Sequence, residues 1–283
     1  MSPPLLAVPN VSEGRDADAL DAIARAFGPG LLHRSADPDH HRAVFTLQSA
    51  PGELHAHVLA GARAALARVD LRAHDGVHPR VGALDVAPIV HLTDELRGAA
   101  CAEALVLADE LAHELALPVF LYGALAGGRT RAELRRGGPA ALQARVDAGE
   151  LAPDFGPRRL HPTAGAVLVA ARPPLVAFNV VIDAPLATAR AAAAAIRDDG
   201  SGGGLPSIRA LGLELPASGR IQVSTNIEDH TRTSAADVVA AVRRFAPVQR
   251  AELVAPAPRA ALRDFPADVP LDGPAALEDQ LPS

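Results

Sequence analysis

The sequence contains no lysine and no tryptophan, and all 27 of its basic residues are arginine. Without lysine the chain cannot form a lysine Schiff base, supply a lysine nucleophile or carry the lysine of a phosphate-binding loop. Pyridoxal enzymes, lysine-dependent aldolases and Walker-type nucleotidases are therefore excluded. Arginine remains available for carboxylates, because its planar fork binds both carboxylate oxygens at once.

Cysteine, aromatic residues and long apolar runs are also scarce. Cys101 is the only cysteine, which excludes an internal disulfide and a multi-cysteine zinc site. Aromatic residues make up 3% and the formal net charge is -6, so neither base stacking nor phosphate neutralisation is expected. No apolar run reaches the roughly 18 to 20 residues of a membrane span, and the first residues do not resemble a signal peptide. We expect a cytoplasmic protein that binds neither nucleic acid nor membrane.

Length and periodicity predict an α/β (α+β) chain of two units, because 283 residues exceed the usual size of one domain. Each unit has the order βαββαβ, which predicts two ferredoxin-like subdomains over 1–172 and 173–283 with a substrate groove between them. The first repeat has expected strands at 5–8, 31–35, 43–47 and 86–90 and helices at 16–27 and 52–69, with Asp16 as a helix cap. It continues with a helix to 115 capped by Thr93 or Asp94, a strand at 119–122, a helix near 140–146 and an apolar run at 166–170. The second has expected strands at 175–182, 208–213, 220–225 and 248–254 and helices at 185–197 and 234–245, and residues 265–283 are expected to be partly loose.

The stretch HDGVHPRVGALDVAP, residues 74–88, combines two histidines, an arginine and two aspartates in one short segment. It reads as a loop entering a strand, and loops held by a rigid scaffold carry much of protein chemistry. Pro79 restrains its own φ and drives His78 toward an extended conformation, so the imidazole stands on stiff backbone. His78 is therefore a candidate general base, because the ordinary pKa of histidine lies near working pH. A structural, hydrogen-bonded loop histidine is the competing interpretation.

Other polar residues gather where predicted strands begin or end. Asn10 and Glu13 follow the first strand, and Arg42 precedes the third. Gln222, Ser224 and Asn226 alternate along one strand, which places them on one face, opposite Ile221, Val223 and Thr225. Such a face is either solvated or lines a groove that Asn179 joins.

A metal site is the rival interpretation of the central loop. His74, Asp75, His78, Asp85 and His91 are potential ligands for a cation such as Zn²⁺. Their spacing does not match HExxH, and the GxSxG motif of serine hydrolases is absent. We expect no metal.

Six motifs occur in an order that matches a known family: VPNVSEGRD, HDGVHPRVGALDVAP, PVFLYG, PDFGP, AFNVVI and QVSTNIED. Together they resemble the formiminotransferase domain of the formiminotransferase-cyclodeaminase family over about residues 5–254. The resemblance implies two α/β subdomains, a homodimer, and transfer of the formimino group from N-formimidoyl-L-glutamate to tetrahydrofolate in histidine degradation. Tetrahydrofolate is then a co-substrate. The chain ends before a cyclodeaminase domain, so we expect a stand-alone transferase.

The resemblance also implies the site residues. His78 corresponds to the catalytic histidine, which would move a proton from the folate N5 to the departing glutamate amine. Asp85 has two interpretations of equal weight, orienting His78 or capping the strand. Arginines Arg42 and Arg80, with others near Gly128 and Gly156, are expected carboxylate clamps. The full expected substrate and folate set is Asn10, Glu13, Arg42, Arg80, Gly82, Asp85, Tyr122, Gly156, Pro157, Arg158, Arg159, Leu160, His161, Pro162, Thr163, Ala164, Gly165, Asn179, Gln222, Ser224 and Asn226.

The chain departs from the family pattern at Ser35, Ala124 and Ala164, which leaves the exact donor open. The alternatives are a diverged folate-dependent transferase with another formyl or formimino donor, a non-catalytic folate-binding protein, and a metal-dependent amidine hydrolase.

Overall fold

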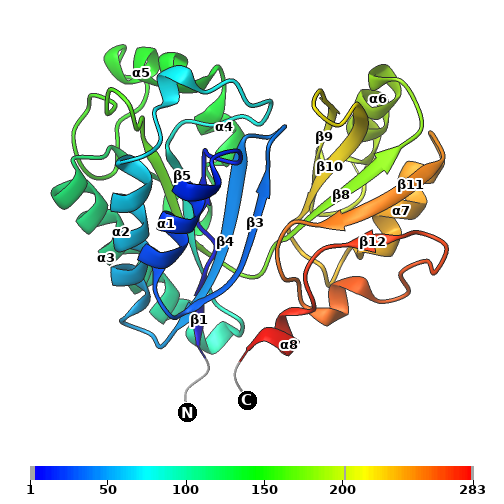
Figure 1. The fold of residues 1–283 in the computed structure, drawn as a ribbon, viewed down its shortest axis with the longest axis horizontal. Coiled ribbons are helices and arrows are strands. Elements are labelled where there is room, and N and C mark those ends of the chain that lie inside the picture. Colours follow the sequence, from blue (N-terminus) through cyan, green and yellow to red (C-terminus); the bar gives the residue numbers. More distant parts are fainter. Residues whose placement is uncertain (1–3, 201, 282–283) are drawn as a thin grey trace. The chain divides into compact units, whose positions relative to one another are not determined.

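The computed structural model describes residues 4–200 and 202–281. The chain divides into two compact units, one ending at Pro173 and the other beginning at Pro174. Each unit has its own sheet (Figure 1). Each unit also has its own cluster of buried apolar side chains. The chain is therefore an α/β protein of two core-bearing units, as the sequence predicts.

The first unit is built on a seven-stranded sheet. β1 and β2 are two halves of one interrupted strand, since both pair with β4 and with β5. Counted as one, they give the order β3–β4–β1/β2–β5–β7–β6, in which β5 is the fourth strand of the βαββαβ repeat. β7 runs parallel to both β5 and β6. The strands are β1 (Leu5–Ala7), β2 (Asn10–Val11), β3 (Leu31–Asp37), β4 (Arg42–Ser49), β5 (Leu84–Val90), β6 (Val119–Leu121) and β7 (Val167–Arg172).

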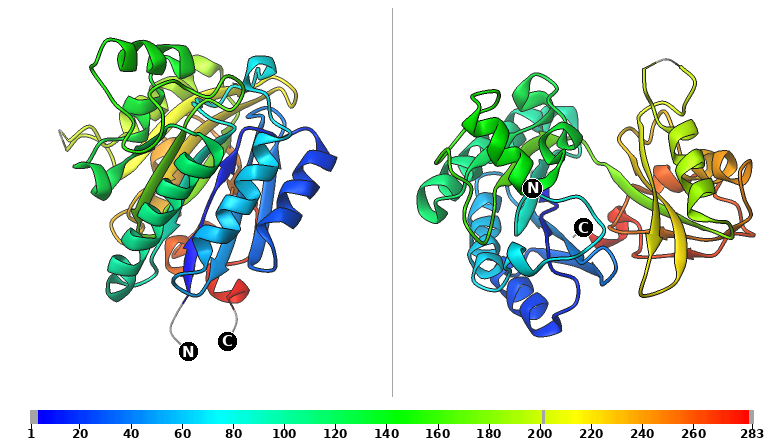
Figure 2. Two further views of the ribbon diagram at one scale, coloured as in Figure 1. Left: turned by 90° about the vertical axis from the view of Figure 1, so that its left-hand side faces the viewer. Right: turned by 90° about the horizontal axis from the view of Figure 1, so that it is seen from above.

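Three helices lie side by side over one face of this sheet: α1 (Ala17–Phe27), α2 (Leu54–Leu66) and α3 (Arg97–Leu115) (Figure 2). Asp16 caps α1 by accepting from the Ala19 amide at 2.9 Å, which confirms the predicted cap. α3 begins after a single 3₁₀ turn at Asp94–Leu96 and has no side-chain cap, so the cap predicted at Thr93 or Asp94 is wrong.

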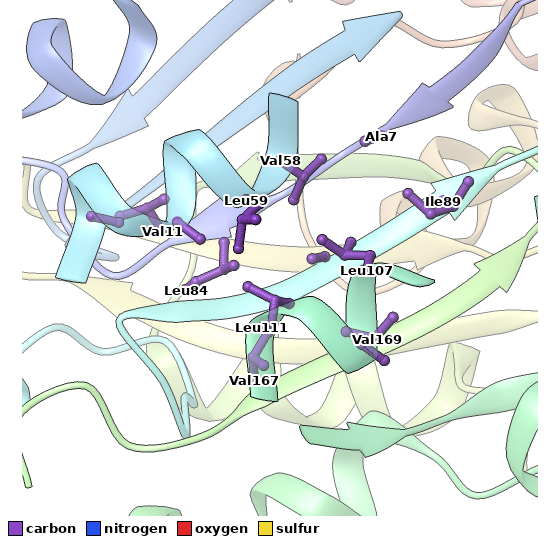
Figure 3. Packing of buried hydrophobic residues seen from close by; sticks show 14 of the residues in the cluster. Ala7, Val11, Val58, Leu59, Leu84, Ile89, Leu107, Leu111, Val167 and Val169 are labelled. Carbon is purple, nitrogen blue, oxygen red and sulfur yellow. The ribbon is translucent and has the colours of Figure 1, made fainter. Parts of the chain in front are cut away.

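Figure 3 shows how α2 and α3 close the core of this unit. Val58 and Leu59 of α2 and Leu107 and Leu111 of α3 point at apolar side chains of the sheet, among them Ile89. All five side chains are at most 9% exposed. Burying one such side chain stabilises the folded state by about 1.5 to 3 kcal/mol, so the packing of α2 and α3 stabilises this sheet.

The opposite face of β5, β7 and β6 carries a smaller apolar cluster that contains Leu134 of α4 and Leu142 and Val146 of α5. α4 (Arg131–Arg135) begins with a capping box between Thr130 and Glu133. The sequence predicts α5 (Gly138–Asp147) near 140–146 but does not predict α4, because five residues are too few to show a helical period.

The second unit repeats the topology with five strands in the order β12–β11–β8–β10–β9. Its first four strands have the same βαββαβ order and the same neighbours as in the first unit. α6 and α7 both pack on one face of the sheet. The elements are β8 (Val176–Ile182), α6 (Leu186–Ile196), β9 (Ile208–Leu215), β10 (Arg220–Ile227), α7 (Ala235–Arg243), β11 (Val248–Leu253), β12 (Leu271–Asp272) and α8 (Leu277–Gln280).

The end of the chain is more ordered than the sequence predicts. β12 pairs in parallel with β11, and the Arg259 amide donates to the Glu278 carboxylate at the start of α8. The predicted loose segment is thus held through residue 281, and residues 282–283 lie outside the described part. Short strands and single helical turns of this kind depend on tertiary partners that periodicity does not reveal.

Among the described residues, none of the helices combines the length and the apolar character that crossing a membrane requires.

Candidate active site

His78 lies on the long connection between α2 and β5, as the sequence places it. Its Nδ1 is 2.7 Å from the Pro79 carbonyl oxygen, which can only accept a hydrogen bond. Arg42 Nη1, which can only donate, lies 3.2 Å from the same nitrogen and would favour the opposite tautomer. The Pro79 contact is the shorter of the two, and it favours a proton on Nδ1 and the lone pair on Nε2. The backbone beside Pro79 therefore prepares Nε2 as the basic atom of the ring.

Three cationic or polar neighbours surround the His78 ring. Arg42 Nη1 lies 3.2 Å from His78 Nδ1, and the His40 ring centroid lies 5.8 Å from that of His78. Burial, Arg42, Arg135 and then His40 lower the pKa of His78 well below its ordinary value, although the side chain keeps part of its surface exposed. The imidazole is consequently neutral at physiological pH, the form that a general base requires.

Asp85 is the buried anion behind this histidine and is 0% exposed. Its Oδ2 accepts from Arg42 Nη1 at 2.7 Å and from Arg135 Nη2, and its Oδ1 accepts from the Val81 amide at 2.8 Å. Burial opposes ionisation of Asp85, but Arg135 and Arg42 outweigh burial and keep its pKa below the usual value. Asp85 thus holds the loop at Val81 and anchors Arg42, while its carboxylate makes no hydrogen bond to His78.

Arg42 joins Asn10 to the same cluster. Arg42 Nε donates to Asn10 Oδ1 at 2.8 Å, and Asn10 Nδ2 donates to the Val8 carbonyl at 2.9 Å. Burial lowers the pKa of Arg42 to about 10 against the opposing effect of Asp85, so Arg42 stays protonated at neutral pH. The structure thus gathers four predicted site residues, Asn10, Arg42, His78 and Asp85.

Arg80 and Glu13 brace loops. Arg80 donates to the Gly76 and His74 carbonyls at 2.8 and 2.6 Å, and so ties together the loop that carries it. Glu13 Oε1 accepts from three consecutive amides, those of residues 14, 15 and 16. Both side chains use their polar atoms to hold backbone, which gives each a structural task beside the predicted substrate contact.

The predicted folate stretch, residues 156–165, runs beside the histidine loop. The Ala83 amide donates to the Ala164 carbonyl at 2.9 Å, and the Ala166 amide donates to the Val81 carbonyl at 3.0 Å. A Cβ on Gly82 would lie 1.8 Å from the Ala166 oxygen, so only glycine fits this approach. Two motifs about eighty residues apart thus form one backbone-paired unit.

Within that stretch the polar atoms are mostly satisfied internally. Arg158 Nη2 donates to the Val146 carbonyl at 3.0 Å, Leu160 N donates to Gln143 Oε1 at 2.7 Å, and His161 Nδ1 accepts from the Ala164 amide at 3.0 Å. The exposed residues are Gly156, Pro157, Arg158, Arg159 and Pro162, whereas Leu160, His161 and Thr163 are half-buried and Ala164 and Gly165 are buried.

Tyr122 follows β6 and is 5% exposed. Its hydroxyl has no hydrogen-bond partner, and the Arg131 guanidinium lies 5.8 Å from the ring centroid. A buried hydroxyl without a partner is costly, and the substrate contact expected at Tyr122 stays a prediction.

The remaining predicted residues lie on the sheet of the second unit. Asn179 of β8 pairs directly with Ser224 of β10, and Gln222 and Asn226 share that face. This confirms the predicted alternation, since Val223, Thr225 and Ile227 face the helices. Asn179 Nδ2 donates to Glu252 Oε2 at 3.2 Å. The predicted groove between the units stays a prediction.

The metal interpretation finds no gathered ligand set. In residues 4–200 and 202–281, no three histidine, cysteine, aspartate or glutamate side chains lie close enough to hold an ion. His74 Nε2 contacts the His41 carbonyl at 2.8 Å, and His91 Nδ1 lies 3.1 Å from the Thr93 carbonyl, so these two candidates face backbone oxygens.

Sequence reasoning missed Arg135, His40 and Glu252. Arg135 lies 50 positions from Asp85, and the one signal that pointed to it was the arginine-rich connection that begins near Gly128. His40 lies in the turn between β3 and β4, where the sequence predicts no site residue. Glu252 lies directly opposite Asn179 across the β8–β11 pair, a relation that requires the register.

Known proteins match this chain over most of its length. A family model described as the formiminotransferase domain, N-terminal subdomain, matches residues 5–172. A formimidoyltransferase-cyclodeaminase of Sus scrofa is 36% identical over 273 residues, covering 91% of this chain and 50% of that protein. The glutamate formimidoyltransferase of Streptococcus pyogenes serotype M1 is 36% identical, and the match covers 80% of this chain and 78% of that protein. The glutamate formimidoyltransferase of Thermoplasma acidophilum is 33% identical, and the match covers 80% of this chain and 77% of that protein.

The chain thus spans about half the length of the two-function relatives and most of the length of the single-function ones. The histidine loop and the stretch paired with it both fall inside the matched region, residues 5–172. The chain belongs to the formiminotransferase family.

Proposed function

We propose that this chain transfers the formimino group from N-formimidoyl-L-glutamate to tetrahydrofolate, yielding 5-formimidoyltetrahydrofolate and L-glutamate, a step of histidine degradation. Family membership supports the reaction. The observation that carries it is the position of His78, whose Nδ1 lies 2.7 Å from the Pro79 carbonyl oxygen, a contact that favours the lone pair on Nε2.

The reaction needs one proton moved between two nitrogens. N5 of tetrahydrofolate attacks the amidine carbon and must lose its proton, while the glutamate nitrogen must gain one to leave. His78 Nε2 accepts the first proton and returns it to the leaving nitrogen, so the imidazole ends the cycle neutral. Arg42 beside Nδ1 favours the neutral ring, which makes the imidazolium short-lived and a ready proton donor.

Folate binding is assigned to residues 156–165. Their pairing with residues 81–83 supports this assignment, because it ties the stretch to the connection that carries His78. The backbone of this stretch pairs with residue 71 and with the histidine loop, so it is more rigid than a free loop. Such rigidity favours precise placement of a substrate.

Three further parts complete the proposal. The second unit acts as the C-terminal subdomain of the transferase, with Asn179, Gln222, Ser224 and Asn226 as substrate contacts. The protein works in the cytoplasm as a homodimer, with small molecules as its partners and no metal. Sedimentation of the purified protein tests the dimer.

The deciding experiment measures glutamate release from formimidoylglutamate by metal-stripped protein, with and without tetrahydrofolate. We expect release only when folate is present. Release without folate would indicate hydrolysis, and its loss after chelation would indicate a metal-dependent hydrolase. No release would point to a different donor or to a silent binding protein.

His78→Ala tests the proposed base. We expect kcat to fall by about 10²- to 10⁴-fold, the usual contribution of a general base, with folate binding kept. His113→Ala is the matched control, because His113 is an exposed histidine of α3 whose polar contacts within the described residues go to Asp109. A His78→Ala protein with kcat like that of His113→Ala would refute the role.

A further inference from the structure

Two guanidinium groups share one buried carboxylate beside His78. Arg42 and Arg135 both bind Asp85, and the three side chains are 9%, 11% and 0% exposed. Arg42 also donates to Asn10 and lies beside the neutral ring of His78, so neither neighbour supplies a negative charge. The described contacts of Arg135 go to Asp85 alone. In the described structure Arg42 and Arg135 both form their ion pair with Asp85, so these three side chains together carry a net charge of +1.

An unbalanced charge that is nearly buried is expensive. Taking an ion out of water costs several kcal/mol unless an opposite charge or good hydrogen bonds replace the lost hydration. Asp85 supplies a single negative charge, so it can offset the desolvation cost of only one of the two arginines. The arrangement is thus suited to receive a second anion.

Arg135 itself has a hydrogen-bond donor that no described group uses. Arg135 Nε is buried and has no acceptor in the described structure, and the Tyr122 hydroxyl is in the same condition. Arg131 lies over the Tyr122 ring and is one helical turn before Arg135 on α4. Guanidinium Nε and Nη groups form the fork that recognises a carboxylate.

We propose that Arg135 binds a carboxylate group of the substrate next to His78, and that this carboxylate balances the charge that Arg42 and Arg135 leave on Asp85. The identity of the ligand rests on the proposed function, in which the donor and its product glutamate both carry carboxylates. Arg135 is thereby a binding residue that orients the donor, while His78 moves the proton.

Binding of glutarate, a plain five-carbon dicarboxylate, tests this site by calorimetry at constant ionic strength. Glutaramide is the neutral ligand of the same shape. We expect the unaltered protein to prefer glutarate, and Arg135→Gln to weaken glutarate binding by about 10- to 100-fold, the worth of a hydrogen bond to a charged group. Arg135→Lys should recover part of the loss, because it restores the charge without the fork.

Arg136→Gln is the matched control. Arg136 is the next residue and is exposed, and its side chain forms no hydrogen bond or ion pair with the described residues. Its charge acts on Glu133, so this variant removes the same charge at a place other than Asp85. Its glutarate affinity should stay within about 2-fold of that of the unaltered protein. Arg135→Gln should fold, because Asp85 keeps Arg42 as a one-to-one partner, and circular dichroism checks this.

Three results would overturn the proposal. The first is equal binding of glutarate and glutaramide to the unaltered protein. The second is no binding of glutarate at all. The third is an Arg135→Gln protein that keeps full glutarate affinity and differs only in the pH profile of its activity. The measurement uses neither folate nor turnover. Charge-selective glutarate binding in a protein without transferase activity would therefore refute the proposed function and retain this site.

Discussion

The two units share one frame and differ in the connection that enters the fourth strand of the repeat. In the first unit residues 67–83 join α2 to β5, whereas in the second residues 244–247 join α7 to β11. The long connection carries His74, His78 and Arg80, and the short one is a tight turn. The reactive groups of the first unit therefore lie in a long loop that the second unit lacks, on a scaffold with the same strand and helix order.

The units also differ in what their sheets bury. The first buries an ion cluster centred on Asp85, whereas the second buries the uncharged side chains of Asn179 and Gln222. The four histidines whose pKa is lowered, His33, His41, His74 and His78, all belong to the first unit. The second unit has a single histidine, His230. Sensitivity to charge and pH should therefore concentrate in the first unit.

Asp85→Asn should have the largest effect on stability. It leaves Arg42 and Arg135 buried without a counter-ion, and breaking a buried pair in this way costs about 3 to 5 kcal/mol. Glu252→Gln is the counterpart in the second unit and should cost about 1 kcal/mol or less, because Glu252 is half-buried and bonds the neutral Asn179. Urea unfolding measures the loss of unfolding free energy in both variants. Equal losses would contradict the expected difference between the two sheets.

Gly82→Ala should come next, at about 3 kcal/mol. The new Cβ would overlap the Ala166 carbonyl oxygen, so the backbone pairing of the histidine loop with residues 164–166 must open. Gly219→Ala, in the second unit, is the control for backbone strain without steric overlap. Gly219 has φ +65°, and no atom lies within 4 Å of the added Cβ. That variant should cost about 1 kcal/mol. Faster amide exchange at Ala83 and Ala166 in Gly82→Ala alone would confirm the local cause.

Acidification should have the smallest effect and should act on the first unit. Burial lowers the pKa of His74 to about 4. Between pH 6.5 and 4 the unfolded chain therefore binds a proton that the folded chain does not, so stability falls as pH drops through this window. We expect His74 to contribute about 1 kcal/mol less stability at pH 5 than at pH 7. His74→Gln should remove that part of the dependence, while His33, His41 and His78, whose pKa values are also lowered, keep the rest. Hydrogen exchange resolved by segment would detect the loss, and an equal loss in both units would contradict it.

Local sequence signals predicted most of the frame and part of the site. The Asp16 cap, the alternation of Gln222, Ser224 and Asn226, and the Pro79 restraint on His78 are each decided by residues close together in the chain. The α4 helix and the paired segments after residue 265 were missed, because short elements lack a period and are stabilised by distant partners.

By itself the sequence determined the two βαββαβ repeats, the family, and the loop that presents His78, since apolar period and motif order are properties of neighbouring residues. Only the tertiary structure decided that Arg42, Asp85 and Arg135 share one buried site and that Gly82 pairs with Gly165. The physical reason is that charge balance and close backbone approach depend on distances between residues far apart in the chain, which no local pattern encodes.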